Sequence, residues 1–341
     1  MDLNIVWFGL LGVLFIAYVA LDGFDLGVGV VLPFFRSDEE RRIALNAVGP
    51  VWDGNEVWLL TAGGALFAAF PHVYAGVFSG LYSALILLLG ALIFRAVSLE
   101  VRGKCAGAAW RKTWDTLFSA SSALIALLLG VAVGNLVTGM RVDAAGNIDA
   151  GPFGLLHLLE PIPLFSGVLA VVLFALHGAL FLRMKTNDGL VRFKLELLLP
   201  KLFAATAVFY IALTMTVLFD RVQPGAWNYE RFPALGAVPV LSMLALISVG
   251  VFLRCRAFKL AFAGTTATIA LLVLTVGVGM FPNLVPAVGN GGNALTIYDS
   301  ASEKTLTAML VIACIGVPLV AFYHVLVYRT FRGKAQADDE A

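Results

Sequence analysis

The chain carries at residues 3–35 the stretch LNIVWFGLLGVLFIAYVALDGFDLGVGVVLPFF, in which Asp22 and Asp25 are the only charged residues. The hydrocarbon core of a bilayer is about 30 Å thick, and a helix needs about 20 residues to cross it. The quoted stretch is longer than that, and similar apolar blocks recur along the chain, as at residues 74–94. This pattern predicts an all-α polytopic integral membrane protein.

Composition supports the same class of protein. Of the 341 residues, 60% are hydrophobic and 13% are charged, and the mean hydropathy is +0.92. Soluble domains carry about 25% charged residues, so a soluble globular enzyme is excluded. The net charge of +1 excludes a basic surface for nucleic acid. Cys105, Cys255 and Cys314 show no C-x-x-C spacing, which indicates neither a disulfide framework nor a thiolate metal site.

About nine transmembrane helices are expected, within a single membrane domain of residues 1–341. Charged residues, Pro and Gly bound the apolar stretches that mark these helices. The expected spans are residues 5–34, 51–70, 74–97, 117–138, 162–183, 201–219, 234–254, 258–281 and 306–328. The first is too long for a signal-peptide core, so we expect it to be retained.

The distribution of Lys and Arg predicts the orientation of the spans, because cytoplasmic loops collect basic residues. Nineteen of the 23 basic residues lie on one side, in the segments 36–42, 95–112, 183–201, 254–259 and 329–334. The other four are Arg141, Arg221, Arg231 and Lys304. We therefore expect a periplasmic N-terminus and a cytoplasmic C-terminus.

The order of the spans suggests two four-helix bundles. Residues 5–138 would hold helices one to four, residues 162–281 would hold helices five to eight in the same orientation, and residues 306–328 would form a peripheral ninth helix. This arrangement rests on geometry alone, because the two halves show no clear sequence repeat.

Four carboxylates and one arginine fall within or at the ends of the first three spans. Asp22 and Asp25 are three residues apart, and Asp53 and Glu56 repeat this spacing in the second span. Arg95 lies at the inner end of the third span. A charge at membrane depth costs about 2.5–3.5 kcal/mol, so these side chains should pair with each other or face water. They predict a polar cluster that is open towards the cytoplasm.

The cluster has two interpretations. In the structural one, Arg95 and one carboxylate form an ion pair that locks the first three helices together, while Asp22 and Glu56 lie at the level of the lipid headgroups. In the functional one, carboxylates near an arginine exchange protons or bind an ion. The residues alone leave both interpretations open.

The four histidines are His72, His157, His177 and His324, and no two of them lie at matching depth for bis-histidine haem ligation. We expect each to be a hydrogen-bonded core or interface residue. The sequence also contains no P-loop, no dinucleotide-binding motif and no H-E-x-x-H motif. Neither a metal site nor a catalytic residue is therefore assigned to this chain.

Two motifs carry a resemblance to a known family. They are DGFDLGVG at residues 22–29 and GPVWDGNEVWL at residues 49–59, the second continuing as TAGGALFAAFP at 61–71. The signature residues of the second motif are Trp52, Asp53, Gly54, Asn55, Glu56 and Trp58. Both motifs closely resemble subunit II of the cytochrome bd family of quinol oxidases, including its cyanide-insensitive branch. Further matching stretches are residues 94–95, 134–135, 152–156, 280–282 and 293–299.

The resemblance implies a heterodimer in the bacterial inner membrane that oxidises quinol and reduces dioxygen to water with protons from the cytoplasm. Subunit I would hold two b-type haems and one d-type or substituted b-type haem, and this chain would hold none. The family also suggests a small single-helix accessory subunit and a structural quinone.

The family pattern further suggests roles for individual residues. Asp25, Asp53 and Arg95 match positions implicated in proton access, and subunit II contributes to an apolar route for dioxygen. Glu56 stands where the family also has Gln, and Tyr298 where Trp is common, which leaves the roles of these two positions open.

Two other classes of protein compete with this interpretation. A proton-coupled secondary transporter would use the same carboxylates, but it would more typically show an inverted repeat and broken helices with midplane sites. A purely structural membrane anchor for a redox subunit would need the carboxylates for assembly and not for turnover.

The distribution of basic residues gives a first testable prediction. Reporter fusions placed in the segments 98–116 and 183–201 should both report a cytoplasmic location, and a fusion at the N-terminus should report the periplasm. Reporters that place the two segments on opposite faces of the membrane would reject the predicted topology.

Overall fold

A computed structural model describes residues 2–143, 146–149, 154–219, 227–288 and 294–337. Pro152, Phe153 and Asn293 of the matching stretches, and Arg221 of the charge pattern, lie outside the described residues.

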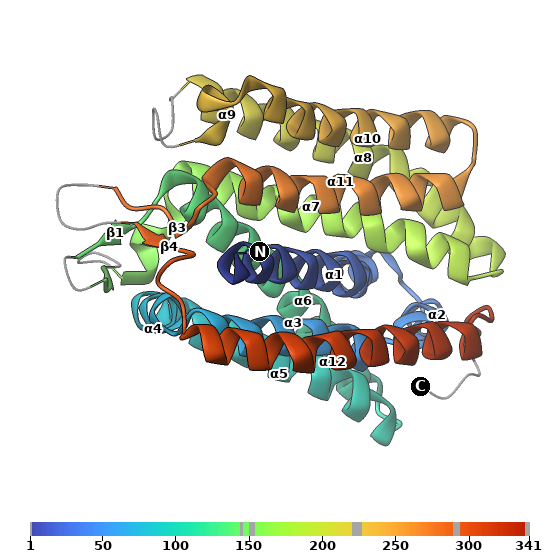
Figure 1. Cartoon of the computed structure of the whole chain (residues 1–341). Helices are drawn as coiled ribbons and strands as arrows, with labels where there is room; N and C mark the ends of the chain where they lie inside the picture. Colours follow the sequence, from blue (N-terminus) through green and yellow to red (C-terminus); the bar gives the residue numbers. More distant parts are fainter. Residues whose placement is uncertain (1, 144–145, 150–153, 220–226, 289–293, 338–341) are drawn as a thin grey trace.

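Eight helices of the described chain are long and apolar enough to cross a membrane. They are α1 (Leu3–Val31), α5 (Tyr82–Val101), α6 (Ala108–Thr138), α7 (Pro161–Lys185), α8 (Gly189–Phe219), α10 (Ala237–Arg254), α11 (Phe258–Met280) and α12 (Glu303–Thr330). Figure 1 shows them running roughly side by side. The prediction of an all-α polytopic membrane protein is confirmed.

The second span is bent, and this differs from the expected pattern. Helix α3 (Trp52–Ala69) is followed by α4 (Pro71–Gly80) at an angle of 119°, and counting this pair as one span brings the number to nine. Residues 74–97 are therefore not one continuous helix, because α4 ends at Gly80 and α5 begins at Tyr82. Proline disfavours helical geometry in the residue before it, and Phe70 has a φ of −131° and a ψ of 66°.

A short helix, α2 (Asp38–Val48), occupies the connection between the first two spans. A capping box holds its start, in which the Ser37 side chain accepts from the Glu40 amide and Glu40 accepts from the Ser37 amide. No helix was expected between the spans 5–34 and 51–70, although the Ser-x-x-Glu spacing at Ser37 and Glu40 is a sequence signal for a helix start. Helix α2 packs against α1 and α7.

Helix α1 is the centre of the packing. It contacts α3 and α6 as well as α7 and α11, and Figure 1 shows it between α7, α8, α10 and α11 on one side and α3, α5 and α12 on the other. Its contact with α7 is close, since a Cβ atom at Gly27 would lie 1.8 Å from the Phe174 carbonyl oxygen. Small residues permit this approach in lipid. The division into two four-helix bundles stays a prediction.

The end of the molecule opposite α2 carries short connections. Strand β1 (Arg141–Val142) pairs with β2 (Ile148–Asp149), and β3 (Asn283–Val285) pairs with β4 (Leu295–Thr296). The remaining short helices are α9 (Asn228–Arg231) and the 3-10 helices η1 (Leu32–Phe34), η2 (Arg102–Lys104), η3 (Gly154–Leu159) and η4 (Pro233–Gly236).

Candidate functional site

A buried ion pair joins α1 to α5. The exposed fractions of Asp22 and Arg95 are both 0%. Arg95 Nη1 donates to Asp22 Oδ2 at 2.8 Å, and Nη2 donates to Asp22 Oδ1. This bidentate geometry satisfies both carboxylate oxygens. Asp22 is therefore a paired buried residue, and an ion pair between Arg95 and one carboxylate was part of the structural interpretation.

Asp25 is also fully buried, but its hydrogen-bond partner is neutral. Asn55 Nδ2 donates to Asp25 Oδ2 at 2.7 Å and lies 3.4 Å from the Leu21 carbonyl oxygen. Among the described residues Asp25 makes no salt bridge. The cluster thus contains one paired carboxylate and one carboxylate held by an amide.

The other two predicted carboxylates are placed differently. Glu56 is half-buried and lies close enough to Arg95 and Asp22 for its charge to interact with theirs. Asp53 is exposed and has neither a hydrogen bond nor an ion pair with the described residues. The buried positions of α3 are Asn55, Trp58, Ala62 and Ala69. The helical phase of α3 therefore turns Asn55 towards α1, and the structure does not bring Asp53 into the cluster.

Helix α12 contributes two residues that sequence analysis did not assign to the site. Tyr328 Oη donates to Asn55 Oδ1 at 2.9 Å. His324 Nε2 lies 2.8 Å from the Gly54 carbonyl oxygen and 3.0 Å from Trp58 Nε1, so it donates to Gly54 in one tautomer and accepts from Trp58 in the other. His324 and Tyr328 are four residues apart and so share one helix face, which was an available signal on an otherwise apolar helix.

The signature motif is thus a contact surface for α1 and α12. Trp58 is 7% exposed and is a core residue, which differs from the interfacial role that we would assign to a tryptophan by default. Gly54 offers its carbonyl group to α12, and Trp52 is half-buried at the first position of α3.

The two buried histidines do not fit axial haem ligation. Nε2 of His177 lies 3.1 Å from the Ala20 carbonyl oxygen, and its Nδ1 lies 2.7 Å from the Thr265 hydroxyl. His324 Nδ1 lies 2.9 Å from the Val320 carbonyl oxygen, and its Nε2 is engaged by α3. Both ring nitrogens of each are occupied within the chain, as expected of core histidines. Nowhere in the described ranges are three His, Cys, Asp or Glu side chains grouped to hold a metal ion.

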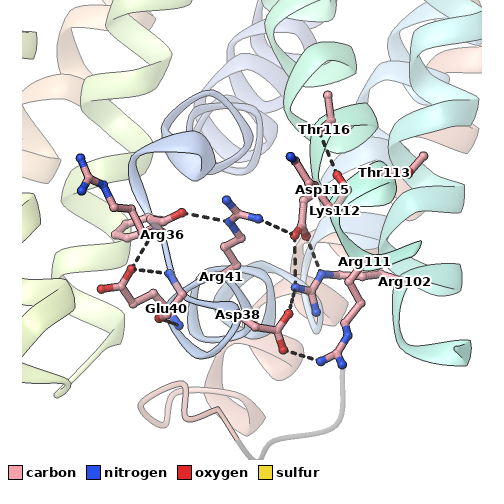
Figure 2. Close-up of polar contacts among 12 residues, drawn as sticks. Arg36, Asp38, Glu40, Arg41, Arg102, Arg111, Lys112, Thr113, Asp115 and Thr116 are labelled. Atoms are coloured by element: carbon pink, nitrogen blue, oxygen red, sulfur yellow. Dashed lines mark hydrogen bonds and ion pairs between the residues drawn. The ribbon is translucent and has the colours of Figure 1, made fainter. Parts of the chain in front are cut away.

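An ionic network joins α2 to its neighbouring helices, and Figure 2 shows its contacts. Asp115 accepts from Arg102 Nε at 2.5 Å and from Arg41 Nη1 at 3.2 Å. Asp38 accepts from Arg102 at 2.7 Å and from Arg111 at 2.5 Å. These bonds tie α2 to the end of α5 and to the start of α6.

Lys194 of α8 extends the network by donating to Glu40 Oε1 at 2.5 Å. Burial raises the pKa of Glu40, but the hydrogen bonds from Lys194 and from the Ser37 and Arg36 amides outweigh it and hold the pKa below its usual value. Burial likewise raises the pKa of Asp38, and the bonds from Arg102 and Arg111 outweigh it and lower that pKa.

The fold and the cluster define a polytopic helical membrane protein whose first three spans enclose an ion pair and an unpaired carboxyl group. The family model described as cytochrome bd terminal oxidase subunit II matches residues 3–331. The chain belongs to this family, which confirms the identification made from the motifs at 22–29 and 49–59.

Individual relatives are similar in sequence to nearly the whole chain. The Escherichia coli K12 protein named cytochrome bd-I ubiquinol oxidase subunit 2 is 35% identical, over 99% of this chain and 96% of the relative. The Bacillus subtilis protein named cytochrome bd ubiquinol oxidase subunit 2 is 33% identical, over 97% and 96%. The solved bd oxidase from Geobacillus thermodenitrificans shares the fold, with a TM-score of 0.77 at 19% identity over 97% of this chain and 99% of that chain.

The lowered pKa values of Asp38 and Glu40 predict that the ionic network around α2 loses stabilising energy in acid. Because each pKa is lower in the folded than in the unfolded state, the stability that these groups contribute is complete above their unfolded pKa values. It is lost as the pH falls below about 4, through the folded pKa values. The apparent unfolding midpoint of the purified protein should fall over this range.

A matched pair of variants tests this prediction. The double variant Asp38→Asn, Glu40→Gln should lose part of the dependence of the midpoint on pH, whereas Glu39→Gln, an exposed neighbour on α2, should keep all of it. Identical midpoints for the double variant and the unaltered protein at every pH would contradict a stabilising role for the network.

Proposed function

We propose that this chain is subunit II of a bacterial quinol oxidase complex in the cytoplasmic membrane, and that it admits protons from the cytoplasm for the reduction of dioxygen to water. Its partner, subunit I, would hold the two b-type haems and the d-type or substituted b-type haem. Quinol and dioxygen are the substrates of the complex. Family membership supports the oxidase assignment, and the names of the relatives support quinol as the reductant.

One observation carries the proposal of proton access. Four buried polar atoms of the cluster lack a partner with hydrogen-bond geometry among the described residues: Tyr18 Oη, Asp25 Oδ1, Glu56 Oε2 and Arg95 Nε. Buried polar groups are almost always hydrogen-bonded, and isolated exceptions point to bound water. Four such atoms around one ion pair favour a hydrated site, and water that links carboxyl groups can carry protons.

The geometry supports different roles for the two aspartates of α1. Asp22 is fixed by Arg95 through both oxygens and serves to hold α1 against α5. Asp25 has a free Oδ1 atom and no cationic hydrogen-bond partner, so it is the group that can exchange a proton. Glu56 would lead from the cytoplasmic side towards Asp25, and Asp53, being exposed, would act only at the mouth of the path.

The same chain would contribute to the dioxygen route and to assembly. Dioxygen is apolar and concentrates in the membrane, so apolar helices conduct it without polar recognition. Exposed apolar side chains line the outer faces of α5, α10 and α12, and these faces offer contact areas for subunit I, for a single-helix accessory subunit and for a structural quinone.

The transporter alternative is less well supported. Its typical feature is a helix broken at the midplane beside the polar site. The break between α3 and α4 lies at Phe70 and Pro71, whereas Asn55 and Glu56 of the cluster lie in the first turns of α3. The break and the polar site therefore lie at opposite ends of α3.

Replacing Asp25 by Asn tests proton access. The change keeps the shape of the side chain but removes its titratable proton. In the purified complex with subunit I we expect oxygen consumption with quinol to fall by about 10²-fold, while haem content and reduction of the haems by quinol stay largely intact. Glu100→Gln, an exposed carboxyl at the cytoplasmic end of α5, is the matched control and should leave turnover unchanged.

If the Asp25→Asn complex assembles with full haem content and consumes oxygen at the unaltered rate across the pH range, the cluster is a structural lock and the protons travel elsewhere.

A further inference from the structure

Helix α12 is attached to the protein by very few side chains. Leu306 and His324 are its buried residues, and most of its large apolar side chains are exposed. Its outer end is held by Trp7 Nε1, which donates to the Leu306 carbonyl oxygen at 3.1 Å. Its inner end is held by His324 and Tyr328 against α3. The polar contacts near the carboxyl cluster are therefore a large part of what positions this helix.

Tyr328 begins a chain of hydrogen bonds that ends on Asp25. Its hydroxyl donates to Asn55 Oδ1 at 2.9 Å, and Asn55 Nδ2 donates to Asp25 Oδ2 at 2.7 Å. In this arrangement the amide presents a donor to Asp25, which suits an ionised carboxylate. The Leu21 carbonyl oxygen, 3.4 Å from the same nitrogen, favours the same orientation.

The same three groups have a second arrangement with as many hydrogen bonds among them, although the Leu21 carbonyl oxygen then loses its contact with the amide nitrogen. A protonated Asp25 is itself a donor, so it suits an amide that presents its oxygen. The amide nitrogen would then face Tyr328, whose hydroxyl is able to accept as well as to donate. A half-turn of the Asn55 side chain therefore exchanges one satisfied hydrogen-bond chain for the other.

We propose that Tyr328 is a positioning residue, whose hydroxyl keeps the Asn55 amide in the orientation that matches the protonation state of Asp25. This inference rests on the proposed function, because it assumes that Asp25 exchanges the protons used in dioxygen reduction. Helix α12 is then part of the proton-access site of this subunit and not only a peripheral helix.

Other charged and titratable groups also face Asp25, and they are common to every variant considered below. They are Asp22 of α1, Glu56 of α3 and Arg95 of α5, and Tyr18 of α1 lies next to Asp22. His177 of α7 bonds to the Ala20 carbonyl oxygen and not to a carboxylate. His324 of α12 is held by Gly54 and Trp58, one turn from Tyr328.

The chain beyond α12 fixes the position of Tyr328. The Ala335 amide donates to the Lys185 carbonyl oxygen at 2.8 Å, and Lys185 and Lys334 each donate to a main-chain carbonyl oxygen of the other segment. Asn46 Nδ2 of α2 donates to the Gln336 carbonyl oxygen at 2.8 Å. These contacts hold the cytoplasmic end of α12 against α7 and α2, so the Tyr328 hydroxyl has a defined place.

Tyr328→Phe tests the inference, because it removes the hydroxyl and keeps the ring. Asn55 Oδ1 then lacks its donor, and the proton of Asp25 is the donor that remains. Asp25 would hold its proton at higher pH. In the purified complex with subunit I, the alkaline limb of the turnover profile should move up by about one pH unit. Tyr323→Phe, which removes an exposed hydroxyl from the same helix, should leave the limb in place.

The outcomes separate this inference from the proposed function. If Asp25→Asn leaves both the rate and the alkaline limb unaltered, the proposed function fails. If Asp25→Asn abolishes the limb but Tyr328→Phe does not move it, the inference alone fails. A Tyr328→Phe complex that is less stable or slower at every pH, with an unmoved limb, shows a purely structural tyrosine and also overturns the inference.

A second measurement needs no assembled Tyr328 variant. Infrared difference spectra of the unaltered complex, recorded between acid and alkaline pH with ¹³C-labelled asparagine, should show an asparagine amide band that changes together with a carboxylic acid band. Both changes should be missing in Asp25→Asn. A carboxylic acid band that titrates without any asparagine band would overturn the inference.

Discussion

The bidentate ion pair between Asp22 and Arg95 is the interaction on which the polar site depends. Both side chains are fully buried within helices that cross the membrane. Burying an unpaired charge in a membrane span has a high free-energy cost, so each of the two residues lowers the cost of burying the other. The pair fixes α1 relative to α5. It also places a guanidinium near Asp25 without a hydrogen bond to it, and the proposal that Asp25 exchanges protons rests on this arrangement.

The remaining contacts of the site follow from the same arrangement. Asn55 reaches Asp25 from α3, and Tyr328 reaches Asn55 from α12. The ionic network of Asp38, Arg102 and Asp115 holds α2 against the end of α5 and the start of α6. A buried polar site of this kind suits a subunit of a terminal oxidase. Reduction of dioxygen consumes protons at a centre that lipid would otherwise isolate from water. The chain supplies a buried polar region among its apolar helices, and its signature motif is the surface on which three helices meet.

Much of the fold was predictable from the sequence, because hydropathy and the spacing of basic residues are properties of local stretches. The cost of buried charge was enough to group Asp22, Asp25 and Arg95. The same cost did not show which of Asp53 and Asn55 belongs to the buried cluster, because only the packing of α3 decides which of the two faces α1. The contact between Asn55 and Tyr328 joins residues 273 positions apart, and no local pattern reports it. By contrast, the break before Pro71 and the start of α2 at Ser37 left signals in the sequence.

The central claim is that Asp22 and Arg95 form a mutually dependent buried pair, and a double-mutant cycle tests it most directly. The apparent unfolding midpoint and the haem content of the assembled complex would be compared for Asp22→Asn, Arg95→Gln and the double variant. Removing one partner of a buried pair costs about 3–5 kcal/mol, whereas removing both leaves no buried charge without its partner. The account predicts that Arg95→Gln alone is the most damaging change and that adding Asp22→Asn recovers part of the loss. Single variants as stable as the unaltered complex, or two losses that simply add, would contradict it.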